Sequence, residues 1–149
     1  MERNERIRQL IETGEAVDEK DAREALWEEV DTAFFRSVDG AAYCEEAGQK
    51  LRDSETDPID RWDLKFRKAV IEVGETPDEL EFLWYQALLD LPTAEPRDEA
   101  ARRRIESTRR RLKRKTEGVS VRLGNDRCRE LFDRYRIRLQ ELFDESEPE

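Results

Sequence analysis

Apolar residues in this chain recur every three or four positions, and the few glycines and prolines fall between the segments that show this spacing. The chain contains 6 Gly and 5 Pro in 149 residues. A spacing of three and four places apolar side chains on one face of an α-helix, and Gly and Pro punctuate helices. We therefore expect an all-α protein in a single domain, residues 1–149, because a chain of this length forms one domain by default.

Helix boundaries follow from the capping residues. Asp-Pro at residues 57–58 is expected to open a helix that ends at Gly74, because Asp caps first-turn amides and Pro suits the first helical position. Thr-Pro-Asp-Glu at residues 76–79 is a capping box that opens the next helix. That helix, extending to about Leu91, is apolar nearly all round, so we place it at the centre of the bundle. Further helices are expected over residues 4–12, 19–37, 41–52, 97–116 and 126–145.

The C-terminal part is expected to form an antiparallel helical hairpin. Within residues 97–116, apolar or small side chains form a narrow seam typical of a coiled coil. The connection to the last helix, residues 118–125, contains Val-Ser-Val-Arg-Leu, whose alternation permits a short strand. The two facing seams are Ala101, Ile105, Thr108 and Leu112, and Cys128, Phe132, Tyr135, Leu139 and Leu142.

The predicted architecture is therefore a single-domain helical bundle of about five helices with a C-terminal hairpin. An acidic bundle occupies residues 1–92, and the basic helix and the C-terminal helix occupy residues 93–149.

One cationic segment lies in an otherwise anionic chain. Residues 97–116 contain ten basic and three acidic side chains, a net charge of +7, whereas the whole chain has a net charge of -10. The first 96 residues carry 12 basic and 26 acidic groups. Like charges three or four positions apart destabilise a helix. We therefore expect an anion to lie near this segment.

Three interpretations of the basic helix stay open. Carboxylates of the same chain can neutralise it, a nucleic acid can bind it through phosphates, or an acidic protein surface can dock on it, that of an identical subunit included. In the last two interpretations the chain is a non-enzymatic binding or assembly subunit, for example in a nucleoprotein or viral assembly, or a protein–protein adaptor. The residues expected to contact the anionic partner are Arg103, Arg104, Arg110, Arg111 and Arg114.

Most catalytic constellations are absent from the sequence. The chain contains no histidine, which removes the commonest general base and most zinc sites. Neither GxxxxGK[ST] nor GxGxxG occurs, so no phosphate-cradling loop is expected. Carboxylate clusters on helices, which can bind Mg²⁺, are the remaining route to catalysis. We expect no cofactor.

Two acidic segments carry that enzymatic alternative. Residues 44–49, Cys-Glu-Glu-Ala-Gly-Gln, and residues 78–85, Asp-Glu-Leu-Glu-Phe-Leu-Trp-Tyr, resemble the paired acidic helices of the MazG-like nucleoside triphosphate pyrophosphohydrolases. In that family, acidic motifs on neighbouring helices hold magnesium against a triphosphate. Gln49 stands where the family has a second acid. The resemblance implies an all-α, Mg²⁺-dependent nucleotide hydrolase with the metal ligands Glu45, Glu46, Asp78 and Glu81.

Composition also bears on the cellular setting. Cys44 and Cys128 match no metal-ligand motif, which favours free thiols in a reducing cytoplasm. No apolar stretch approaches the roughly 20 residues of a membrane span, so we expect a soluble protein without a membrane partner. The chain has 22 Arg, 6 Lys and 38 acidic residues. This balance suits the high-salt cytoplasm of a halophile, and a GC-rich genome produces the same preference for Arg.

Overall fold

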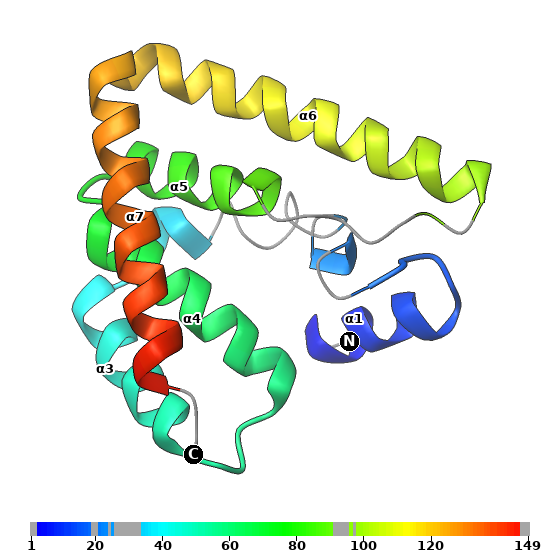
Figure 1. The fold of residues 1–149 in the computed structure, drawn as a ribbon, viewed down its shortest axis with the longest axis horizontal. Coiled ribbons are helices and arrows are strands. Elements are labelled where there is room, and N and C mark those ends of the chain that lie inside the picture. The colour runs from blue at the N-terminus through cyan, green and yellow to red at the C-terminus, as the bar shows by residue number, and fades with distance from the viewer. Residues whose placement is uncertain are drawn as a thin grey trace.

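The computed structural model describes residues 3–18, 21–23, 25, 34–90, 96 and 98–146. The predicted helix over residues 19–37 and the linker around Pro92 lie largely outside these residues. Within the described part every regular element is a helix, which confirms the all-α class (Figure 1). The helices are α1 (Arg3–Glu12), α3 (Gly40–Arg52), α4 (Pro58–Val73), α5 (Pro77–Asp90), α6 (Glu99–Leu123) and α7 (Asn125–Ser146).

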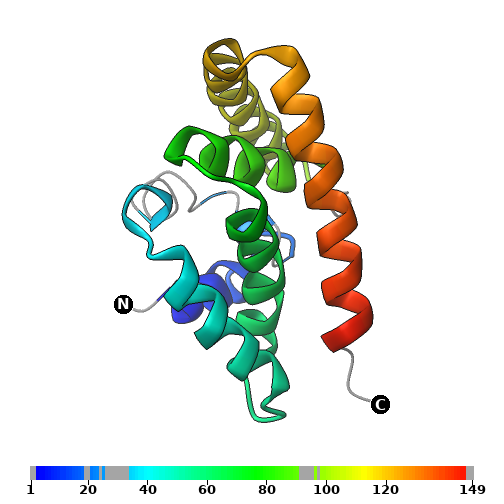
Figure 2. The same ribbon diagram turned by 90° about the vertical axis from the view of Figure 1, so that its left-hand side faces the viewer.

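Helices α4 and α5 lie at the centre of the molecule. Helix α4 packs against α3, α5 and α7, and α5 packs against α4, α6 and α7 (Figure 2). The side chains of α5 from Phe82 to Tyr85 are all 3% exposed or less. A helix without a polar face must be enclosed on all sides. The prediction that this helix is central is confirmed.

The turn between the two central helices contains one hydrogen bond of the predicted capping box, and the second goes to the residue before the cap. The Thr76 Oγ1 atom accepts a hydrogen bond of 3.2 Å from the backbone N–H of Glu79, and the Glu79 carboxylate accepts one of 2.9 Å from the backbone N–H of Glu75. Gly74 follows the last residue of α4. A Cβ at this position would lie 2.7 Å from Leu80 Cδ2 and 3.2 Å from the Leu80 backbone nitrogen, so a larger residue would displace Leu80.

Helix α6 is longer than the sequence predicts. Its helical hydrogen bonding continues through Gly118 and the Val-Ser-Val-Arg-Leu segment to Leu123, so the expected loop with a short strand is wrong. A strand would place Val119 and Val121 on one face. Val119 is instead 4% exposed and Val121 84% exposed, as a helix requires. The helix ends at Gly124, whose φ of 92° and ψ of 147° are accessible to glycine but strained for other residues.

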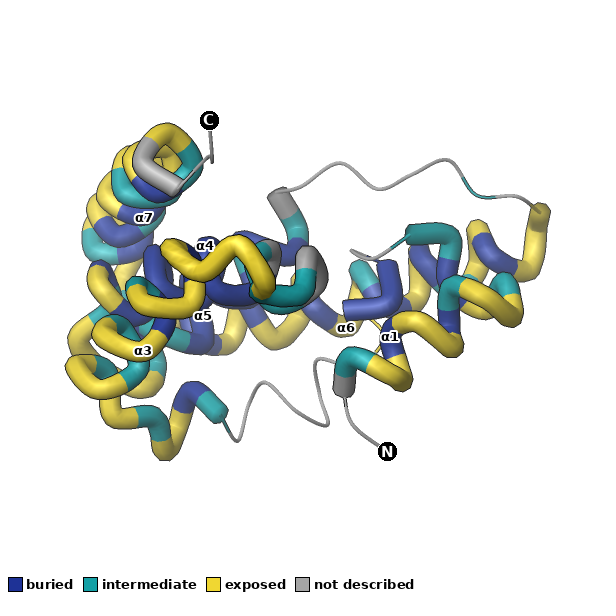
Figure 3. Tube along the Cα trace, turned by 90° about the horizontal axis from the view of Figure 1, so that it is seen from below, coloured by how far each residue is buried: buried dark blue, intermediate teal, exposed yellow. Residues whose placement is uncertain are grey.

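The predicted antiparallel hairpin of the two C-terminal helices is not observed. Because only Gly124 separates them, α6 and α7 diverge from this junction in different directions (Figures 1 and 2). Helix α6 runs along α5, whereas α7 runs along α4 and α5. Both seams are buried or half-buried as expected, and Leu112 of α6 and the whole seam of α7 belong to the core around the central helices. Buried and exposed positions accordingly alternate along both helices (Figure 3).

The N-terminal segment has a small apolar core of its own. Ile7, Leu10, Ala16 and Ala22 form a buried cluster separate from the main core. Polar contacts attach this segment to α4. Arg8 forms an ion pair with Asp57, Asn4 donates a hydrogen bond of 2.7 Å to Asp60, and Arg23 Nε lies 2.8 Å from Asp63 Oδ1. The segment is therefore attached to the central helices by charged and polar groups, in contrast to the apolar packing among α4, α5 and α7.

Candidate anion-binding surface on helix α6

A narrow buried stripe attaches α6 to the core. Leu112 is fully buried in the main core, and Thr116 Oγ1 donates a hydrogen bond of 2.8 Å to the Leu112 carbonyl oxygen. The predicted seam residues are all buried, and the stripe continues past them toward the C-terminus of the helix. Its members are Ala101, Ile105, Thr108, Leu112, Thr116 and Val119. Nearly all the remaining positions of α6 are available to charged side chains.

Neighbouring carboxylates neutralise the cations in the first two turns of α6. Arg102 binds Glu99 and also lies 2.7 Å from Glu106, and Arg103 Nε lies 3.3 Å from the same Glu99 carboxylate. The hydrogen bond from Arg102 lowers the pKa of Glu99. These pairs lie on the helix surface, where ion pairs contribute little to stability. The charge at this end of α6 is nevertheless locally balanced.

Arg104 is neutralised by a distant residue. Its Nη1 and Nη2 atoms lie 2.7 and 2.5 Å from the two carboxylate oxygens of Asp21. Asp21 is 1% exposed, and the Arg104 side chain is 31% exposed. The sequence predicts that Arg104 contacts a partner, but its guanidinium is bound to this buried carboxylate. The charge of Arg104 is therefore neutralised by a carboxylate of the same chain, as the first of the three interpretations expects.

Two further cations of α6 bind α5. Arg109 donates a hydrogen bond of 2.6 Å to the carbonyl oxygen of Leu89, near the C-terminal end of α5. Cations stabilise this end of a helix because its last carbonyl groups lack partners within the helix. Near the other end of α5, Arg122 pairs with Asp78 at 3.1 Å, and the hydrogen bond raises the pKa of Arg122.

The middle of α6 differs from both ends. Arg110, Arg111, Lys113, Arg114 and Lys115 are all exposed, and together they are called the cationic ridge here. Across the part of the chain that the structure describes, four of these residues make no ion pair: Arg110, Lys113, Arg114 and Lys115. Helix α6 forms one edge of the molecule (Figures 1 and 2).

A shallow depression lies at the start of the ridge. It has a volume of about 340 Å³ and is lined by Glu106, Arg109, Arg110 and Lys113. The Glu106 carboxylate already accepts from Arg102, so its charge is balanced. The depression thus presents two ridge cations and the partly buried Arg109 to an anionic group. Of the five arginines predicted to bind a partner, Arg110, Arg111 and Arg114 lie in the ridge, Arg103 lies one to two turns before it, and Arg104 is bound to Asp21.

The carboxylates of the enzymatic alternative do not form a common site. Glu45 and Glu46 are exposed on α3, and Glu46 pairs with Lys50 at 3.0 Å. Asp78 on α5 is bound to Arg122, and Glu81 accepts a hydrogen bond of 2.8 Å from Arg36. Among the described residues, no group of three or more Asp, Glu, His or Cys residues lies close enough to hold a metal ion.

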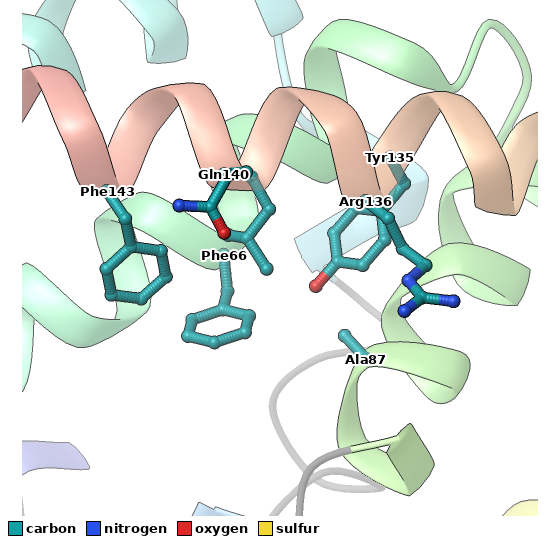
Figure 4. A pocket seen from close by; sticks show the side chains of 7 residues that line it. Phe66, Ala87, Tyr135, Arg136, Gln140 and Phe143 are labelled. Atoms are coloured by element: carbon teal, nitrogen blue, oxygen red, sulfur yellow. The ribbon is translucent and has the colours of Figure 1, made fainter.

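A second cavity lies between α4, α5 and α7, where sequence reasoning indicated only core packing. It has a volume of about 240 Å³ and is lined mainly by aromatic and aliphatic side chains, with Arg136 and Gln140 at its edge (Figure 4). Among the described residues, no carboxylate or thiol lines it. The described lining residues are Phe66, Ala87, Tyr135, Arg136, Leu139, Gln140 and Phe143.

Comparisons with protein-family models, with curated proteins and with solved structures find no match to this chain. Within the described residues, none of the helices combines the length and the apolar character that crossing a membrane requires. The geometry and charge of the surface thus provide the basis for assigning a function.

Proposed function

We propose that this chain is a binding or assembly subunit that docks on an anionic partner through the cationic ridge of α6. The observation that carries the proposal is the contrast along this helix. Carboxylates bind Arg102 and Arg104 before the ridge and Arg122 after it, whereas four of the five ridge cations have no ion pair within the described residues. Carboxylates of the same chain thus neutralise cations near the two ends of α6. The four ridge cations without an ion pair among the described residues are available to an anionic partner.

The ridge is unfavourable for the isolated helix. Arg110 and Arg114 are four positions apart, as are Arg111 and Lys115. Each such pair of like charges destabilises a helix by a few tenths of a kcal/mol. An anionic partner removes this repulsion on binding. The free energy that the ridge costs in the free protein therefore favours the complex.

The test compares two variants with equal loss of charge. The ridge variant carries Arg110→Gln, Lys113→Gln and Arg114→Gln. The control variant carries Arg52→Gln, Arg129→Gln and Arg136→Gln, three exposed positions on α3 and α7. Binding of fluorescent poly-L-glutamate and of inorganic polyphosphate is measured by anisotropy at low salt.

We expect the ridge variant to bind at least one of these polyanions about tenfold to a hundredfold more weakly than the wild type. The control variant should lose less than about threefold, because its charges lie away from the ridge. Thermal melting should show an unchanged or higher midpoint in the ridge variant. Equal losses in both variants, or no binding of either polyanion by the wild type, would refute the proposal.

A further inference from the structure

We infer that the anionic partner of the cationic ridge is a nucleic acid duplex, contacted at its phosphates without reading of base sequence. This inference rests on the proposed function, because it names the partner of the same surface. Three properties of the described residues distinguish a duplex from an acidic protein, from a second copy of this chain and from a single strand.

The first property is the lack of an apolar anchor in the ridge. From Arg102 to Lys115 the exposed positions of α6 are occupied only by Arg, Lys, Glu and Ser. The centre of a protein–protein interface is rich in aromatic and aliphatic side chains and poor in Lys. The exposed apolar side chain of α6 is Val121, more than one turn beyond the ridge. A surface that offers charge alone suits phosphates, which are bound through the release of counterions.

The second property concerns the carboxylates of the chain itself. A head-to-tail dimer needs a row of available acids that faces the ridge of the next copy. Many described acids are instead bound to arginines of their own chain, among them Asp21, Asp63, Glu72, Asp78, Glu79 and Glu81. Exposed acids that form no ion pair among the described residues, such as Glu45 and Asp133, lie on different helices. The carboxylates that these arginines bind are therefore not available to the ridge of a second copy.

The third property is the density of charge along the ridge. The four ridge cations that make no ion pair within the described residues lie within six residues, which rise about 7.5 Å along the helix axis. A duplex carries one phosphate charge per about 1.7 Å of its axis, and a single strand one per about 3.4 Å. The ridge therefore matches the charge density of a duplex more closely. Proteins that bind single strands also use exposed aromatic side chains for base stacking, and α6 contains no aromatic residue.

The experiment measures the salt dependence of binding to a fluorescein-labelled 20-base-pair duplex of mixed sequence. Four phosphate contacts predict a slope of log K against log salt of about -3.6. The ridge variant should show a slope shallower by about 2.7, because it loses three contacts. The control variant should keep the wild-type slope. A second duplex of shuffled sequence should bind within about twofold of the first, because phosphate contacts carry no sequence information.

Other probes distinguish failure of this inference from failure of the proposed function. If poly-L-glutamate binds more tightly than the duplex and the ridge variant abolishes this binding, the partner is an acidic protein surface and the duplex inference is overturned. Tighter binding of a single-stranded 20-mer overturns it as well, and so does self-association that depends on the ridge in sedimentation velocity. If the wild type binds none of the polyanions and does not self-associate, the proposed function itself fails.

Discussion

Arg104 and Asp21 lie 83 positions apart in the sequence and form a two-pronged ion pair, with N–O distances of 2.7 and 2.5 Å. Asp21 also accepts a hydrogen bond of 2.9 Å from the backbone N–H of Val17. Two residues later, Arg23 is fully buried and binds Asp63 of α4. The segment around residues 21–23 thus links the N-terminal half of α6 to α4 through two charge pairs, one partly buried and one buried.

Replacement of Arg104 by Gln should destabilise the protein substantially. The substitution leaves the Asp21 carboxylate, in a residue that is 1% exposed, without its cation. Loss of one partner of a fully buried ion pair costs about 3–5 kcal/mol, and we expect about 2–3 kcal/mol here because water partly reaches Arg104. Chemical denaturation measures the difference.

Arg103→Gln is the matched control for this prediction. It removes the adjacent cation of the same helix, whose side chain is 76% exposed and paired only on the surface. We expect a change below about 0.5 kcal/mol. A double variant with Asp21→Asn and Arg104→Gln should recover part of the lost stability, because it removes the orphaned charge as well. If Arg103→Gln and Arg104→Gln lower the free energy of unfolding equally, the Arg104–Asp21 pair contributes no more to stability than a surface ion pair.

Leu112 should be the residue on which attachment of α6 depends most. It is fully buried in the main core, in the middle of the narrow stripe of α6. Leu112→Ala should cost about 2–5 kcal/mol, since it removes buried methyl groups and leaves a cavity. Val121→Ala on the exposed side of the same helix, where Val121 is 84% exposed, should change stability by less than about 0.5 kcal/mol. A small effect of Leu112→Ala would mean that α6 does not depend on this stripe.

Two glycines near the end of α6 should respond to alanine in opposite directions. Gly118 lies inside the helix, and a Cβ there would meet no atom within 4 Å. Gly118→Ala should therefore raise the free energy of unfolding by about 0.5–1 kcal/mol. Gly124 has a φ of 92°, so Gly124→Ala should lower it by about 1–3 kcal/mol. Melting curves of both variants test the boundary of α6, since a helix that ended before Gly118 would not gain from the first substitution.

Glu79 should make stability depend on pH in the acidic range. Its carboxylate accepts hydrogen bonds of 2.9 and 3.1 Å from Arg127, and these bonds lower the pKa of Glu79 against the opposing effect of burial. A carboxyl group with a lowered folded-state pKa stabilises the fold above its unfolded pKa of about 4.3, and this stabilisation is lost as pH falls through the folded-state pKa. The wild type should therefore lose stability below about pH 4.5.

The variant Glu79→Gln isolates this contribution. It should melt at a lower temperature than the wild type at pH 7, and the two melting temperatures should converge as the pH falls toward about 3. Asp133→Asn, at an exposed position of α7, is the control and should melt like the wild type throughout this range. Parallel pH profiles for wild type and Glu79→Gln would disprove the assignment.

Local signals in the sequence predict most of the helix boundaries. The capping box at Thr76 and the Asp-Pro pair at residues 57–58 mark the starts of α5 and α4 correctly, because caps depend only on neighbours in the chain. The sequence predicts the end of α6 too early, because Gly118 resembles a helix stop. Gly118 has an ordinary helical conformation, and a Cβ there would meet no atom within 4 Å. The backbone therefore does not require glycine at this position, and the sequence alone does not reveal this.

The arrangement of the C-terminal helices could not be predicted from their seams. A seam indicates which face of a helix is buried, but α5 and α4 can cover it as well as a neighbouring helix can. For the ridge, too, the sequence predicts only part of the arrangement. Its exposure follows from the seam at Leu112, whereas the neutralisation of Arg104 depends on Asp21, which only the three-dimensional fold brings near. Local periodicity therefore predicts where charge is displayed, and tertiary contacts determine which charges remain available.

The single-residue joint at Gly124 also has a mechanical consequence. Force applied to the ridge by a bound partner has no slack tether to stretch, because α6 passes directly into α7 and α7 is anchored in the core by Leu131 and Tyr135. A partner bound to the ridge would therefore keep a fixed orientation relative to the helical core, which a charged tail on a flexible linker would not impose.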